Sequence, residues 1–155
     1  MKKFLSKYVE IYTVVTLVIS LIIFILKDKT TKSRKMSAIL LLVSCVHCWE
    51  ESKWAGGYFD LILNNFKLKG KVDDNLAYTV LTDLALVASV IPCAIDKAPF
   101  KFLSSGMGLF ECASHTLGIK MYNMEKPYVP GMYTSWLWGA LAIYNLGEQL
   151  LNGRE

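Results

Sequence analysis

Two histidines and three carboxylates stand at helical spacing in two separate motifs of this chain. The motif HCWEE places His47, Glu50 and Glu51 at positions i, i+3 and i+4, so on a helix they share one face. The motif ECASH places Glu111 and His115 at positions i and i+4. These are the only two histidines in the sequence. Imidazole and carboxylate groups are ligands for divalent ions such as Zn, Fe and Mn, so the two motifs predict a metal site.

The predicted site draws on both motifs and on two further segments. A bound ion would explain how so many carboxylates stay charged inside an apolar chain. Eight residues are assigned to it, as metal ligands (His47, Glu51, Glu111, His115), as catalytic bases or groups that hydrogen-bond the ligands (Glu50, Asp83), and as supporting residues (Tyr133, Thr134).

Most of these residues also have an ordinary structural explanation. His47 could be a satisfied histidine at an interface. Glu50 and Glu51 could mark the end of a helix at a water interface. Asp83 could form a hydrogen bond that packs two helices together. Glu111 and His115 could form a local pair that locks one helix to its neighbours. The argument for a site therefore depends on whether the helices bring these residues to one level.

The elements that would position these residues are apolar stretches of about 20 residues, the length that crosses a bilayer as a helix. The hydrophobic fraction is 54%, the charged fraction is 19% and the mean hydropathy is +0.36. This composition is more apolar than that of an ordinary globular domain. Five such stretches are present: 9–27, 36–55, 76–97, 100–122 and 131–151. They predict an all-α integral-membrane bundle of about five transmembrane helices, a multi-pass protein.

The chain divides at about residue 35. Residues 1–35 predict a transmembrane helix followed by a basic loop, and no small-residue cleavage site follows the apolar run, so we interpret it as an uncleaved anchor. Residues 36–155 predict a helical membrane core that carries both motifs. Within the 56–75 link, the sequence YFDLILNNFKL favours an amphipathic helix lying at the membrane interface.

Five alternating helices would bring the two motifs to one depth. The stretches 36–55 and 100–122 would run parallel. His47 and Glu111 are then equally far from the starts of their helices, and Glu51 and His115 match in the same way. Asp83 would enter at a similar level from the antiparallel stretch between them. Ionisable residues that gather at one level inside a membrane bundle usually mark a functional site.

Charge and cysteine content exclude some other classes. The net charge is +4, and the lysines are scattered without a basic stripe interleaved with aromatic residues, so we expect no nucleic-acid partner. The four cysteines give no disulfide framework and are expected to be small buried apolar residues.

The order of the motifs resembles a known family. H-x-x-E-E, then E-x-x-x-H, then Tyr128, Pro130-Gly131 and Thr134, over about residues 36 to 145, is similar to the HXXEE-motif membrane proteins. That family consists of small multi-helix proteins of undetermined function. The resemblance implies a helical membrane bundle and brings no reaction or substrate with it.

Three functions remain open at this point. The first is a metal-dependent membrane enzyme, a hydrolase or an oxidase, acting on a lipid-like or small apolar substrate. The second is a proton- or cation-coupled transporter or pore. The third is a non-catalytic protein that binds a lipid or sterol. Membrane lipid is the expected partner, and an oligomer is compatible with each function.

Overall fold

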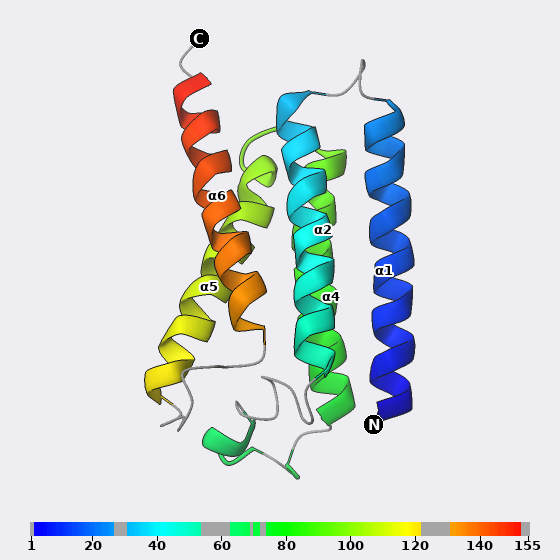
Figure 1. Ribbon diagram of the computed structural model, residues 1–155, viewed down its shortest axis with the longest axis vertical. Helices are drawn as coiled ribbons and strands as arrows, with labels where there is room; N and C mark the ends of the chain where they lie inside the picture. Colours follow the sequence, from blue (N-terminus) through cyan, green and yellow to red (C-terminus); the bar gives the residue numbers. More distant parts are fainter. Residues whose placement is uncertain are drawn as a thin grey trace.

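The described part of the chain folds into five long α-helices and one short 3-10 turn. The computed structural model describes residues 2–26, 31–53, 63–68, 70–71, 74–121 and 131–152. The helices are α1 (Lys2–Ile25), α2 (Lys32–Lys53), α4 (Asp74–Ala94), α5 (Leu103–Met121) and α6 (Met132–Asn152), with the turn η2 (Phe100–Phe102) before α5 (Figure 1). No strand occurs in these residues. Each apolar stretch picked out in the sequence therefore corresponds to one long helix.

The prediction that these helices cross a membrane is wrong. Among the residues described, no helix combines the length and the hydropathy that a crossing requires. The apolar stretches are the middles of helices that continue into charged turns. For example, α2 begins at Lys32, includes Arg34 and Lys35 near its start, and includes Glu50 near its end. The predicted integral-membrane, multi-pass localisation is corrected with it.

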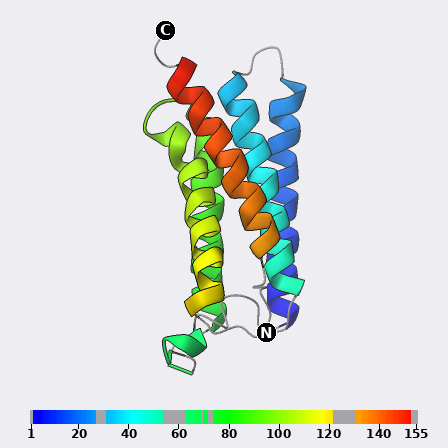
Figure 2. The same ribbon diagram turned by 60° about the vertical axis from the view of Figure 1, so that its left-hand side comes forward.

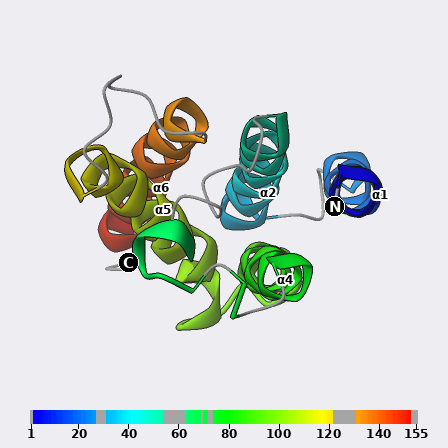
Figure 3. The same cartoon turned by 90° about the horizontal axis from the view of Figure 1, so that it is seen from below.

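Helix α2 lies at the centre of the bundle. It packs against α1, α4, α5 and α6, and the view along the bundle shows α1 at one edge and the α5–α6 pair at the other (Figure 3). Successive long helices alternate in direction, so α2 and α5 run the same way, while α6 crosses them at a tilt (Figures 1 and 2). The parallel arrangement of the helices that carry HCWEE and ECASH is thus confirmed.

Helix α1 turns a polar face toward α2. Tyr12, Thr16 and Ser20 recur every four residues, and all three are buried. The Tyr12 hydroxyl lies 2.8 Å from Ser44 Oγ, a hydrogen bond across the helix pair. The outward side chains of α1 include the exposed apolar residues Ile11, Val14, Leu17, Val18, Leu21 and Ile22. An apolar face of this extent is a surface for contact with another apolar surface.

The α5–α6 contact is made by small residues against one large ring. A Cβ added at Gly108 of α5 would lie 2.4 Å from Cδ1 of Trp138, so only glycine admits the indole there. Trp138 is fully buried and packs with Leu40 and Val43 of α2. The indole joins α2, α5 and α6 just beside His47, with ring centroids 5.8 Å apart.

The cysteines behave largely as expected. Cys45, Cys48 and Cys93 are buried and carry free thiols, and Cys112 is half-buried and also free. Of the predicted interfacial helix (58–68), residues 63–65 are helical and residues 66–68 are not, while residues 58–62 fall outside the described residues. Tyr128 and Pro130, which carry part of the family resemblance, are also outside them.

Candidate metal centre

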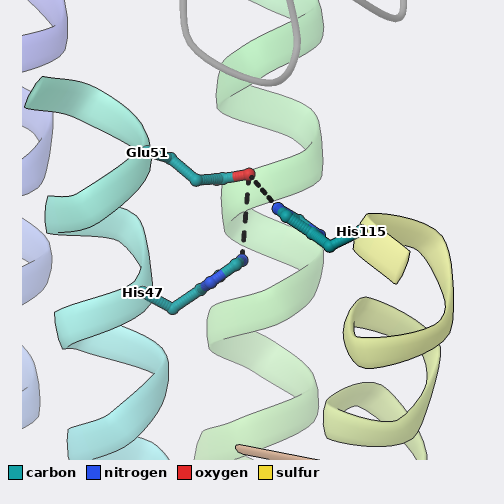
Figure 4. A group of neighbouring side chains, drawn as sticks. All are labelled: His47, Glu51 and His115. Carbon is teal, nitrogen blue, oxygen red and sulfur yellow. Dashed lines mark ion pairs between the residues drawn. The ribbon is translucent and has the colours of Figure 1, made fainter. Parts of the chain in front are cut away.

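The α2 half of the site is built from the last two turns of that helix. His47 and Glu51 are one turn apart, and both side chains turn toward α5 (Figure 4). His47 is 3% exposed, whereas the Glu51 side chain is 18% exposed. The imidazole is therefore inside the bundle, and the carboxylate reaches from it toward solvent.

The α5 half comes from the matching turn of the parallel helix. His115 is fully buried and points at Glu51 (Figure 4). Glu111, one turn earlier, has a side chain that is 16% exposed. Because α2 and α5 run the same way, their i, i+4 pairs meet side by side.

The four side chains converge on one small volume. Glu51 Oε1 lies 3.3 Å from His115 Nε2 and 3.8 Å from His47 Nε2. Glu111 Oε2 lies 3.8 Å from His47 Nε2 and 3.6 Å from His115 Nδ1. The two imidazole rings meet edge to face with centroids 4.9 Å apart. Both histidines thus contact both carboxylates.

Three of these residues can hold a metal ion. His47, Glu51 and His115 each offer a ligand atom, and the three atoms lie within 4.8 Å of one another. A tetrahedral ion bound at about 2.1 Å from each ligand keeps its ligands about 3.4 Å apart. The distances of 3.3 and 3.8 Å from Glu51 Oε1 to the two Nε2 atoms are close to that value.

Gly131 lets the backbone before α6 approach this group closely. It precedes α6 and has φ of +86°, a left-handed conformation that favours glycine. A Cβ there would lie 2.6 Å from His115 Nε2, 2.8 Å from His47 Cε1 and 2.8 Å from Glu51 Cγ. Any side chain at this position would clash with the three candidate ligands. The sequence order Pro130-Gly131 was noted as part of the family resemblance, but the contact of Gly131 with the histidines was not foreseen.

The carboxylates set the charge state of His47. Burial lowers the pKa of His47, but the nearby carboxylates of Glu51, Glu111 and Glu50 outweigh burial and raise the pKa above its ordinary value. Burial, together with the charges of Glu51 and Glu111, raises the pKa of the neighbouring Cys48 thiol well above its ordinary value. The cluster thus attracts cations, and Cys48 stays a neutral thiol rather than a thiolate ligand.

Of the other predicted residues, Glu50 and Thr134 are close to the centre. Thr134 Oγ1 lies 3.0 Å from His47 Nδ1, and the Glu50 carboxylate accepts hydrogen bonds from both the backbone N–H and the hydroxyl of Thr134. Asp83 is exposed on α4 and is not one of the four side chains joined around the histidines. Tyr133 is 62% exposed and packs its ring against Trp136. We therefore remove Asp83 and Tyr133 from the site.

A cavity of about 270 Å³ lies at the opposite end of the bundle, where α2 and α5 begin and α6 ends. Its lining includes Lys32, Met36, Lys101, Tyr144 and Gln149, and none of the His/Glu cluster. The candidate metal centre is thus a packed cluster reached through two partly exposed carboxylates, not the floor of this cavity.

Comparison with protein-family models, with curated proteins and with solved structures found no match. The resemblance to the HXXEE-motif proteins therefore stays a prediction that depends on the motif residues alone.

Proposed function

We propose that this protein binds one divalent metal ion through His47, Glu51 and His115 and is a metal-dependent enzyme. The observation that carries the proposal is the convergence of these three ligand atoms from two parallel helices, packed against Gly131 where no side chain fits. Two histidines and one glutamate are a ligand set of catalytic zinc sites, in which the fourth position is open to water or substrate.

The ion would supply Lewis acidity, which polarises a substrate oxygen or activates water. Glu111 is placed to move a proton in such a reaction, because its carboxylate is 3.8 Å from His47 Nε2 and partly exposed. The two buried imidazoles would orient the ion. The partly exposed carboxylates of Glu51 and Glu111 would form the side from which a substrate approaches.

The same ligand set occurs in zinc hydrolases and in non-haem iron oxygenases, so the metal that binds decides between hydrolysis and oxidation. The substrate class we propose is lipid-like or small and apolar. In support, the helices that carry the ligands also present exposed apolar side chains, such as Val46 on α2 and Leu117 on α5.

The test is turnover by protein loaded with either Zn²⁺ or Fe²⁺. Hydrolysis of p-nitrophenyl esters of increasing acyl length and consumption of oxygen in the presence of fatty acids are both followed. We expect one of the two activities, its loss on chelation and in His115→Ala, and a fall of about 10²- to 10⁴-fold in Glu111→Gln. The control is Asp83→Asn, which should keep full activity because Asp83 is outside the cluster. Equal rates with and without metal, for both probe classes, would refute the enzyme.

A further inference from the structure

The start of α6 is tied to the metal-site face of α2 by one carboxylate. Glu50 Oε2 lies 2.9 Å from the backbone nitrogen of Thr134 and 2.5 Å from its Oγ1. Thr134 is in the first turn of α6, where backbone N–H groups have no partner within the helix. Glu50 thus acts as a cap supplied by another helix, and its negative charge suits the positive end of the α6 dipole.

The chemistry of Glu50, Thr134 and His47 determines which group donates in each of these hydrogen bonds. An ionised carboxylate only accepts hydrogen bonds, and a threonine hydroxyl has one hydrogen to donate. With that hydrogen directed to Glu50, Oγ1 of Thr134 has lone pairs left for a donor. The atom 3.0 Å away is His47 Nδ1, which must then carry a hydrogen.

A neutral imidazole with its hydrogen on Nδ1 has its lone pair on Nε2. In His47 that atom is the one 3.8 Å from Glu51 Oε1 and 3.8 Å from Glu111 Oε2, at the centre of the cluster. The contact on the outer side of the ring therefore determines which nitrogen is offered to a metal.

We propose that Glu50 and Thr134 are positioning residues that hold His47 in the Nδ1–H tautomer and so aim its Nε2 lone pair at the metal centre. The role of these residues in metal binding rests on the proposed metal site, whereas the tautomer of His47 is a property of the metal-free protein. Partners of this kind usually change metal affinity by about 10- to 100-fold.

The second histidine provides an internal control. His115 Nδ1 lies 3.1 Å from the carbonyl oxygen of Glu111, one turn earlier on the same helix. A carbonyl oxygen only accepts, so His115 is expected in the same Nδ1–H tautomer. Because that acceptor belongs to the backbone, side-chain changes at Glu50 or Thr134 should leave the His115 tautomer unchanged.

The experiment is ¹⁵N NMR of the two histidine rings in metal-free protein, at a pH of about 9, well above the ordinary pKa of histidine. We expect Nδ1–H for both rings in the wild type. In Thr134→Val, His47 should lose this preference while His115 keeps it. Thr134→Ser, which retains the hydroxyl, should restore it.

Zinc affinity of the same proteins is measured by titration calorimetry. It should fall about 10- to 100-fold in Thr134→Val and return in Thr134→Ser. If no variant binds metal but the tautomers behave as stated, the proposed function fails and the positioning of His47 stands. A wild-type His47 in the Nε2–H form would overturn the inference. So would a Thr134→Val protein with unchanged tautomer and affinity, and the wild-type spectrum decides even where that variant does not fold.

Discussion

Replacing Gly131 by alanine should damage both the fold and the metal centre. The backbone there has φ of +86°, and an L side chain in this conformation costs about 1–2 kcal/mol. The new Cβ would also lie 2.6 Å from His115 Nε2, whereas ordinary contact begins at 3.4 Å, so the ring must move by about 0.8 Å. Overpacking of this kind costs about 1–3 kcal/mol in addition. The predicted loss of stability is about 2–5 kcal/mol.

Gly70 provides the matched control for this prediction. It also has a left-handed conformation, with φ of +78°, but a Cβ there would meet nothing within 4 Å. Gly70→Ala should therefore cost only the backbone contribution of about 1–2 kcal/mol. Both free energies of unfolding are measured by urea denaturation of metal-free protein.

Metal affinity separates the two glycines further. Metal–ligand distances tolerate only about ±0.2 Å, so a displacement of His115 by several tenths of an ångström should lower zinc affinity at least about tenfold in Gly131→Ala. Gly70→Ala should bind zinc like the wild type. The reasoning is refuted if Gly131→Ala matches Gly70→Ala in both stability and zinc affinity.

Three further results are expected. The pKa of His47 is raised above its ordinary 6.5, so the stability that its protonation gives the metal-free protein is complete below pH 6.5 and is lost as the pH rises through the folded-state pKa. Because zinc binds the neutral ring, the stability gained from zinc should instead increase over the same pH range. Unfolding curves at several pH values, with and without zinc, measure both pH dependences. Gly108→Ala should destabilise the protein by about 1–3 kcal/mol because its Cβ would overlap Trp138, whereas Gly106→Ala, with nothing within 4 Å, should be neutral or stabilising by up to about 1 kcal/mol, as thermal unfolding would show. Asp83→Asn should leave zinc affinity within about twofold of the wild type by calorimetry, and a tenfold loss would return Asp83 to the site.

Helix positions and the meeting of the two motifs were accessible from the sequence because both depend on periodicity. The i, i+4 spacing placed His47 with Glu51 and Glu111 with His115, and alternation of five helices made α2 and α5 parallel. Equal distance from the helix starts then predicted that the pairs would face each other. These steps need only helix geometry and chain direction.

Other features depend on how a helix is rotated about its axis, which periodicity alone did not settle. Asp83 was predicted to lie level with the cluster, but its side chain is on an exposed face of α4. Tyr133 and Thr134 are neighbours in the chain, yet only Thr134 turns toward His47, because adjacent residues on a helix point about 100° apart. The close approach of Gly131 depends on a turn whose path no local pattern specified.

The membrane assignment failed for a different reason. Counting apolar residues in a window ignores which side of each helix they occupy and how far the helix continues. On α1, the residues turned toward the bundle include Tyr12, Thr16 and Ser20 as well as Val9 and Ile23, while many other apolar side chains are exposed. On α2, charged residues such as Arg34 and Glu50 lie inside the helix bounds, not in the links.

The central claim is that His47 and His115 belong to one metal centre. The direct measurement is the metal content per chain, determined by elemental analysis after incubation with Zn²⁺ or Fe²⁺ and desalting. It compares the wild type with His47→Ala, His115→Ala and the control Asp83→Asn. Circular dichroism checks the helical content of each protein. We predict about one ion per chain in the wild type and in Asp83→Asn, and its loss in both histidine variants that retain the helical fold. A wild type that retains neither metal, or a folded variant lacking one histidine that still binds a full equivalent, would contradict the account.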